Sequence, residues 1–245
     1  MKLLLSKLTT VLNDEEKVKL LKTLSNPIKT TTVLFLNAHA VNISHKCNRN
    51  LNLFYNADYL LRDGAGIKLA MSVHDMAPGL NLNGTDLIPQ FLRMNTGKSM
   101  IIIGTTEPWL SSSANAFDSM GLKVLTVIDG YRSTSEYLSI FAAHKADIVL
   151  LCLGMTKQEE LANLLKLTYP DQETTIICGG AICDFVAQKY PRAPSILREC
   201  GLEWLYRLYK EPTRLFRRYV VGNPLFVYYA LSSGLRNYIH KIKMR

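Results

Sequence analysis

The sequence of 245 residues lacks the motifs that identify several large classes of protein. Its five cysteines form no CxxC pair, which argues against a zinc site or a disulfide framework and favours reduced thiols. It contains neither a GxGxxG dinucleotide fingerprint nor a GxxxxGKS/T phosphate-binding loop. The histidines and acidic residues show no HExxH or DxD spacing, so we expect no metal site.

Long apolar runs are missing as well. The best candidate, Val220–Leu231, has about twelve residues with Gly-Asn-Pro at 222–224 inside it, whereas a membrane-spanning helix needs about 20. Met1–Leu12 shows no apolar run and cleavage site of the signal-peptide type. We therefore expect a cytoplasmic protein that does not span a membrane.

Positive charge is concentrated at one end of the chain. Residues 192–245 carry eleven Lys or Arg and three Asp or Glu, which is +8 of the total net charge of +9. Such a segment favours an anionic partner, either a lipid surface, a nucleic acid or a phosphorylated substrate, although a solvated basic face is the plain alternative. No linker divides the sequence, so we expect one domain over residues 1–194 and an appended C-terminal tail over 195–245.

Apolar runs of strand length alternate with segments of helical periodicity. Strands are predicted at Val33–Asn37, Tyr59–Arg62, Met100–Gly104, Lys123–Ile128, Asp147–Gly154 and Thr174–Cys178. Helices are predicted at Asp14–Leu24, Ala65–Val73, Thr85–Met94, Pro108–Phe117, Ser135–His144 and Lys157–Leu167. Because nearly all-apolar strands are covered on both faces, the pattern predicts an α/β fold, a Rossmann-like doubly wound, mostly parallel sheet. The basic tail is predicted to be helical, with a kink or a new helix start at Pro212.

Polar residues and glycines follow the predicted strands. In folds of this class, ligands bind at the carboxyl ends of the strands. Those positions hold Asn37, Asp63-Gly64, Gly104, the run from Gly154 to Glu159, and Gly179-Gly180. Glycine lets the backbone approach a ligand closely, and the next helix offers free N–H groups to a phosphate. The pattern favours a nucleotide ligand.

These segments, in their order and spacing, resemble the WecG/TagA/CpsF glycosyltransferases over nearly the whole chain beyond residue 30. The matching motifs are Asp63-Gly64, GTDL at 84–87, GMTKQE at 154–159, GAICDF at 180–185, RAP at 192–194, GLEWLYRL at 201–208 and Glu211-Pro212-x-Arg214. The resemblance implies an inverting, metal-independent enzyme of bacterial cell-surface polysaccharide synthesis. It would move N-acetylmannosamine, its uronate or a related hexose from a UDP-sugar to a polyprenyl-diphosphate-linked sugar, with no cofactor beyond the donor.

The resemblance also implies partners for the tail. Arginines there alternate with Tyr and Phe, a composition that by itself suits either a membrane interface or a nucleic acid. Similarity to the family favours the anionic inner face of the cell membrane, with the protein bound peripherally, and no nucleic acid is expected. A homo-oligomer is also compatible with the resemblance.

Asp63 matches the family's proposed catalytic base, which would take the proton from the acceptor hydroxyl. From the residues alone, the alternative is an N-cap for the helix predicted at Ala65–Val73. The resemblance further implies that Arg214, Arg217 and Arg218 hold the leaving diphosphate in place of a metal.

Donor binding is expected of a larger set of residues. They are Asn37, Thr85, Asp86, Gly104, Lys157, Gln158, Glu159, Gly180 and Asp184. Thr85 and Asp86 could instead cap the following helix, and the residues at 157–159 could serve as ordinary helix-start residues.

Three positions depart from the family pattern. Phe35 stands where many members have Thr, Asn81 where many have Arg, and Gln188 where Gly is expected. Losing an Arg at 81 removes a candidate charge clamp for a phosphate or a uronate carboxylate. These departures leave open an alternative function, a non-catalytic UDP-binding membrane adaptor derived from the same family.

Overall fold

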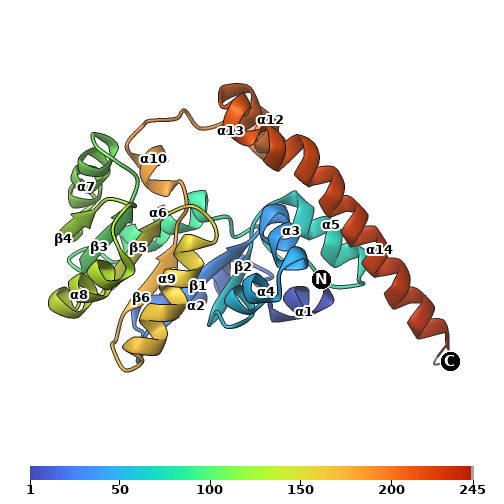
Figure 1. The fold of residues 1–245 in the computed structure, drawn as a ribbon, viewed down its shortest axis with the longest axis horizontal. Helices are drawn as coiled ribbons and strands as arrows, with labels where there is room; N and C mark the ends of the chain where they lie inside the picture. Colours follow the sequence, from blue (N-terminus) through green and yellow to red (C-terminus); the bar gives the residue numbers. More distant parts are fainter. Residues whose placement is uncertain (244–245) are drawn as a thin grey trace.

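A single sheet of parallel strands forms the centre of the protein in the computed structural model, which describes residues 1–243 (Figure 1). The strand order is β2-β1-β6-β5-β3-β4, and every neighbouring pair runs parallel. The strands are β1 (Thr31–Leu36), β2 (Tyr59–Arg62), β3 (Ser99–Gly104), β4 (Lys123–Ile128), β5 (Ile148–Cys152) and β6 (Thr175–Cys178). The predicted α/β Rossmann-like class is confirmed, and the sheet is wholly parallel.

Helices connect the strands and cover the sheet. Those of the body are α1 (Lys2–Lys7), α2 (Asp14–Ser25), α3 (Ala38–Lys46), α4 (Asn48–Tyr55), α5 (Ala65–Val73), α6 (Gly84–Met94), α7 (Trp109–Ser119), α8 (Thr134–His144), α9 (Lys157–Thr168) and α10 (Ile182–Val186). The sequence analysis did not predict α1, α3, α4 or α10. In α3 and α4 the apolar residues are interrupted by Asn, His and Ser, residues of modest helix propensity.

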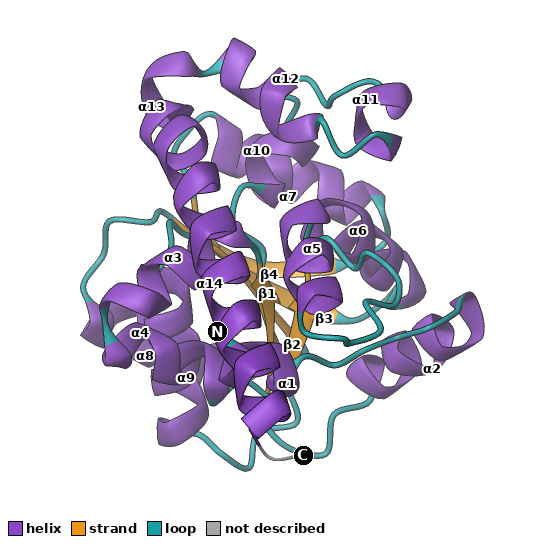
Figure 2. Ribbon diagram, turned by 90° about the vertical axis from the view of Figure 1, so that its right-hand side faces the viewer, coloured by secondary structure: helices purple, strands orange, loops and turns teal. Residues whose placement is uncertain are grey.

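The strands are largely buried on both faces, which explains their nearly all-apolar sequences, except for the edge strand β4, which is partly exposed. In β1, Leu34 and Leu36 point into the layer of α3, α4, α8 and α9, whereas Val33 and Phe35 point into the layer of α2, α6 and α7. Figure 2 shows the sheet between these two layers.

The described part of the C-terminal tail consists of helices joined by short turns. Its elements are α11 (Ser195–Glu199), α12 (Glu203–Lys210), α13 (Pro212–Phe216), a π-helical turn η1 (Arg217–Val221) and the long helix α14 (Gly222–Lys243). Pro212 begins α13, so the predicted new helix start is confirmed. Residues 244 and 245 of the predicted tail lie outside the described residues.

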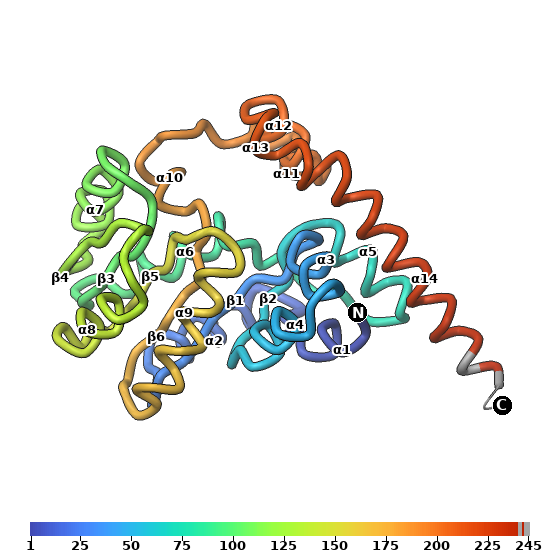
Figure 3. Tube along the Cα trace, in the orientation of Figure 1, coloured from blue at the N-terminus to red at the C-terminus, as the bar shows by residue number. Residues whose placement is uncertain are grey.

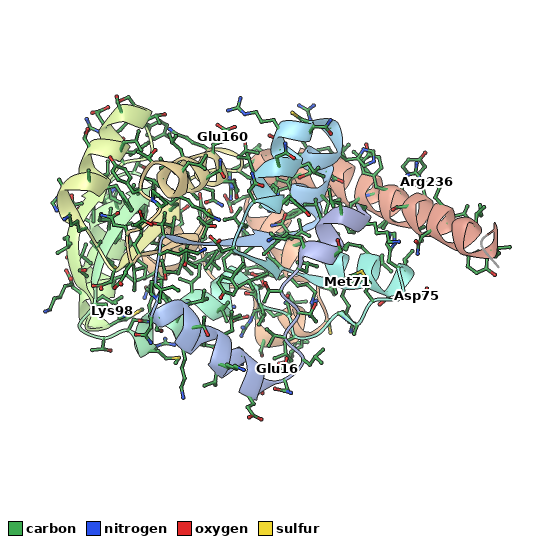
Figure 4. The ribbon with its side chains drawn as sticks, turned by 90° about the horizontal axis from the view of Figure 1, so that it is seen from below. Glu16, Met71, Asp75, Lys98, Glu160 and Arg236 are labelled. Carbon is green, nitrogen blue, oxygen red and sulfur yellow. The ribbon has the colours of Figure 1, made fainter. Side chains whose placement is uncertain are left out.

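From α10 the chain passes over the top of the molecule to α12 and α13, and α14 then descends away from them beside α3 and α5 (Figures 1 and 3). Helix α14 packs on α3 and α5, and its Phe226 and Ala230 join the body's core. Gly234 permits this contact, because a Cβ at that position would lie 2.1 Å from Val73 Cγ1. The later half of α14, where Figure 4 marks Arg236, reaches beyond the edge of the sheet.

The cysteines are free thiols, with Cys152, Cys178 and Cys183 buried and Cys47 and Cys200 exposed. Within residues 1–243, none of the helices combines the length and the apolar character that crossing a membrane requires.

Candidate active site

Asp63 and Asn37 lie side by side where β2 and β1 end. Asn37 accepts a hydrogen bond from the Ala40 backbone N–H at 3.0 Å through Oδ1, which caps α3. This bond turns its amide group toward Asp63, and Nδ2 donates to Asp63 Oδ2 at 3.2 Å. Asp63 does not cap α5, because the capping position belongs to Gly64 and carries no side-chain bond. The alternative of a helix cap is therefore wrong for Asp63.

The loop after Asp63 is held by two polar residues. Gly64 has a φ of 93°, a conformation that favours glycine, and its N–H donates to Asn81 Oδ1 at 2.8 Å. The buried guanidinium of Arg62 donates to the carbonyl oxygens of Gly64 and Leu80. Asn81, one of the departures from the family pattern, thus supports the backbone beside Asp63.

Two cavities adjoin Asp63. The first, of about 400 Å³, we call the tail cavity, and it is lined by His39, Leu69, Trp204, Tyr219, Asn223, Phe226 and others. The second, of about 230 Å³, we call the strand cavity, and it is lined by Gly154, Gln158, Gly180, Asp184, Arg214 and others. Five residues line both: Asn37, Asp63, Thr85, Arg207 and Arg218. A carboxylate in this shared wall can act between two ligands, one in each cavity.

The strand cavity is built from the ends of β5 and β6. Gln158, in the first turn of α9, accepts a hydrogen bond from the Gly180 N–H at 3.0 Å and so fixes the glycine turn after β6. Asp184 accepts from Thr105 Oγ1 at 2.6 Å and pairs with Lys189 at 3.3 Å. These contacts hold backbone and side-chain polar groups around a space that suits a phosphorylated ligand.

Arginines of the tail supply the positive charge. Arg207 of α12 and Arg218 of η1 line both cavities, and Arg214 lines the strand cavity alone. The Nε atoms of Arg207 and Arg218 are buried and have no hydrogen-bond partner among the described residues. Burial lowers the pKa of Arg218, although the group stays a cation near neutrality. Buried guanidinium groups with unused donors are typical of sites for carboxylates and phosphates.

Burial raises the pKa of Asp63 above the ordinary value of an aspartate. The hydrogen bond from Asn37 and the charges of Arg218, Arg207 and Arg62 act in the opposite direction. A carboxylate with a raised pKa is a stronger base than an exposed one. His39, in the wall of the tail cavity, has its pKa lowered to about 4 by burial and by the cations Arg218 and Lys46, so it is neutral at physiological pH.

Asp86 binds the tail and lines neither cavity. It forms ion pairs with Arg192 and, at 3.7 Å, with Arg198. These cations and the hydrogen bond from Asn83 lower its pKa. Asn83 is the residue that caps α6, so neither Thr85 nor Asp86 does.

Four other predicted site residues also lie outside both cavities. Gly104, at the end of β3, has a φ of 139°, and a Cβ there would lie 2.2 Å from the Cys152 carbonyl oxygen. Lys157 donates to the Gly130 carbonyl at 2.7 Å. Glu159 is buried and accepts from Gln158 at 2.8 Å, and burial raises its pKa to about 7. Arg217 is exposed.

Sequence reasoning did not select several residues that line the cavities. Glu203, Trp204 and Arg207 belong to the GLEWLYRL segment, which was used only as a family motif. Of the departures from the family pattern, Phe35 lines the strand cavity. Gln188 has a φ of 59°, in the left-handed region, which accounts for the Gly expected there.

The described residues contain no group of three or more His, Cys, Asp or Glu side chains placed to hold a metal ion. A family model described as the glycosyl transferase WecG/TagA/CpsF family matches residues 3–240, nearly the whole chain. Members of such a family move a sugar from a donor to an acceptor. The chain belongs to the WecG/TagA/CpsF family of glycosyltransferases.

Proposed function

We propose that the protein transfers a hexose from a UDP-sugar to a polyprenyl-diphosphate-linked sugar, with inversion and without a metal. The transferred sugar would be N-acetylmannosamine, its uronate or a related hexose. The observation that carries the proposal is the place of Asp63, a carboxylate in the shared wall of two cavities that also contain Arg207 and Arg218.

In this reaction, Asp63 removes the proton from the acceptor hydroxyl as the oxygen attacks the anomeric carbon of the donor sugar. The bond from that carbon to the β-phosphate oxygen breaks on the opposite face, so the configuration inverts and UDP leaves. Asn37 supports this role because its donated hydrogen bond fixes the position of the carboxylate.

The tail arginines would neutralise the departing diphosphate. Arg207 and Arg218 come closest to this role, since both line both cavities and both have a buried, unpartnered Nε in the described structure. Guanidinium groups that are already in place stabilise developing negative charge, as a divalent metal does in other transferases. Arg214, which pairs with Glu211 at 2.6 Å, would assist from the strand cavity.

We further propose that α14 lies against the inner face of the cell membrane. Its exposed apolar side chains recur every three or four residues and so share one face: Tyr228, Leu231, Leu235, Tyr238 and Ile242. An apolar stripe on a basic, amphipathic segment favours binding at the interface of an anionic membrane.

The test is UDP release by the full-length protein with UDP-N-acetylmannosamine and a short-chain prenyl-diphosphate-linked sugar, each alone and together, with and without chelator. We expect release only with both substrates, and equally in chelator. Asp63→Asn should lower turnover by about 10²–10⁴-fold while UDP still binds. UDP binding without release for any donor and acceptor would instead support the membrane adaptor.

The pH dependence tests the base directly. Asp63 must be deprotonated to accept a proton, so activity should fall as the pH is lowered through its pKa. Because burial raises that pKa, the fall should begin at a higher pH than an exposed aspartate would give. A profile that stays level down to the ordinary pKa of an aspartate would contradict this role.

A further inference from the structure

We propose that the tail cavity is the acceptor subsite, where Trp204 stacks on the acceptor's sugar ring and Arg198 faces its diphosphate. This inference rests on the proposed transfer reaction, and it assigns the two substrates to the two cavities. The donor would then occupy the strand cavity, on the other side of Asp63.

The composition of the two walls supports this assignment. The wall of the strand cavity includes the glycine turns after β5 and β6 and the start of α9, features that suit a nucleotide diphosphate, beside apolar side chains such as Phe35 and Phe185. In the tail cavity the aromatic side chains Trp204, Tyr219 and Phe226 all come from the C-terminal tail. Its volume of about 400 Å³ lies within the range of about 300–1,000 Å³ that is usual for small-molecule sites.

Trp204 provides a flat apolar surface in this cavity. Its ring packs edge to face with that of Tyr219, with centroids 6.0 Å apart and planes at 64°. This contact fixes the orientation of the indole, while 36% of the residue remains exposed. The C–H face of a hexose ring is apolar and matches an exposed aromatic face, while its hydroxyls can bond to nearby polar groups such as Asn223 and His39.

Arginines divide between the cavities in a way that suits two diphosphates. Arg207 and Arg218 are shared, Arg214 lines only the strand cavity, and Arg198 lines only the tail cavity. Arg198 is oriented by its ion pair with Asp86 at 3.7 Å. Its Nε is buried and has no hydrogen-bond partner within residues 1–243, so it can donate to a bound anion.

An apolar path leads from the tail cavity to the surface. Leu69 of α5 and Val227 of α14 line the cavity and are 42% and 37% exposed. From Val227 the exposed apolar residues continue along α14, on the helix that Figure 1 shows descending beside α3 and α5. A lipid chain attached to the acceptor would leave along this path, whereas a nucleotide donor has no such group.

The chain contains only two tryptophans, which permits a binding test that does not depend on catalysis. In the Trp109→Phe protein, Trp204 is the one remaining tryptophan, and Trp109 lies in neither cavity wall. The probe is farnesyl-diphosphate-linked N-acetylglucosamine, with farnesyl diphosphate and UDP as comparisons. We expect the probe to change Trp204 emission saturably, and UDP to change it much less. In the matched Trp204→Phe protein, Trp109 emission should not respond to the probe.

Variants then connect binding to specificity. Trp204→Ala should raise the Kd of the probe and the KM for the acceptor by about tenfold, and leave the KM for the UDP-sugar unchanged. Arg198→Gln should weaken the binding of farnesyl diphosphate itself, a ligand without a sugar, while Trp204→Ala should affect it little.

Two results would overturn the assignment: unchanged probe affinity in Trp204→Ala, or an equal loss of UDP and probe affinity. Failure of the subsite and failure of the function are distinguishable. Saturable probe binding at Trp204 without transfer by the wild-type protein would remove the function and keep the subsite. Transfer by the wild-type protein, with unaltered acceptor kinetics in Trp204→Ala and Arg198→Gln, would keep the function and remove the subsite.

Discussion

The body and the C-terminal tail both contribute to the site, but they are held in place differently. Side chains of the body are fixed by hydrogen bonds to the backbone, as Asn37 is by Ala40 and Gln158 by Gly180. In the tail, Arg207 and Arg218 reach the cavities with a buried Nε that no described residue satisfies. Apart from the edge strand β4, the body's strands are buried on both faces, whereas α14 is exposed along an apolar stripe.

The body therefore sets the position of the carboxylate of the site, whereas the tail supplies its positive charge. The sheet sets the place of Asp63 before any ligand arrives, because two neighbouring strand ends and the Asn37 amide determine it. The cations depend on how the tail docks, since they come from α12 and η1. Elements with few buried contacts open at low free-energy cost. If α12 and η1 opened, the site would lose its arginines while Asp63 stayed in place.

The largest effect in the tail is expected from Arg218→Gln, with Arg217→Gln as its matched control. Arg218 lines both cavities, whereas its neighbour Arg217 is exposed and lines neither. Removing a preorganised charge at the leaving group should lower kcat by about 10²–10³-fold, and Arg217→Gln should have little effect. Steady-state UDP release measures both.

The same variant should move the acidic limb of the pH–rate profile. Arg218 lowers the pKa of Asp63, so its removal raises that pKa and shifts the limb to higher pH. Equal losses of activity in the Arg217 and Arg218 variants, with no shift, would mean that the tail acts only through its overall charge.

A smaller effect is expected from undocking α14 without touching a charge. In Gly234→Ala, the new Cβ would overlap Val73 Cγ1, which it would approach to 2.1 Å. Overpacking of this kind typically costs about 1–3 kcal/mol, so we expect about a tenfold loss of kcat/KM. Limited proteolysis should cut the tail faster, and Tm should fall by about 2–4 °C for each kcal/mol, because Phe226 and Ala230 of α14 belong to the body's core.

The double variant Val73→Ala/Gly234→Ala is the control for this experiment, because it removes Val73 Cγ1, the atom that the new Cβ would overlap, and leaves the Val73 carbonyl oxygen at 3.2 Å as the nearest neighbour. It should recover most of the activity. If it does not, the glycine matters for a reason other than close packing between α14 and α5.

Weaker still is the contribution of the ion pairs that Asp86 forms with Arg192, just before the tail, and with Arg198 within it. The side chains of Asp86 and Arg192 are 40% and 34% exposed, and partly exposed pairs contribute about 0–1 kcal/mol. Asp86→Asn should therefore lower kcat/KM by no more than about fivefold. Added salt should reduce wild-type activity toward that of the variant, because screening weakens the same pairs. Asp171→Asn, a change at an exposed turn, is the control and should leave activity and its salt dependence as in wild type.

The sequence predicted the body well because most of its strands are buried on both faces and are followed by glycine or polar residues. It predicted Asp63 through a motif, and the geometry then removed the helix-cap alternative, since Gly64 takes the capping position. Prediction was weaker in the tail. Side-chain direction there depends on the break at Pro212 and on the π-helical turn, which rotates Arg217 and Arg218 differently from a continuous helix. Arg207 was consequently left out of the predicted site and Arg217 included.

Buried acids were also difficult to predict from the sequence. Glu159 follows Lys157 and Gln158 at the start of α9 and was read as a donor-binding residue. It faces the core because the first turn of α9 packs behind β6, where burial and, to a smaller extent, the charge of Glu159 raise the pKa of Cys178. Helical periodicity gives the buried face of a helix, but a polar residue on that face does not reveal whether a cavity or the core lies opposite.

Glu159→Gln should have the smallest effect on turnover and should change stability instead. Its pKa is raised by burial from the ordinary 4.5 to about 7, so the folded protein binds a proton more tightly than the unfolded chain. The stability that this group contributes is full below pH 4.5 and declines as the pH rises to about 7. Glutamine carries no charge and can still accept the hydrogen bond from Gln158, so the variant escapes this decline. Its free energy of unfolding relative to wild type should increase from pH 5 to pH 7.5 by on the order of 1 kcal/mol, or about 2–4 °C in Tm.

Glu160→Gln, at the adjacent and partly exposed position marked in Figure 4, controls for the loss of one negative charge from α9. A constant difference between Glu159→Gln and wild type at the two pH values would show that the Glu159 carboxyl is solvated, and the wall behind the glycine turn would then be open to water.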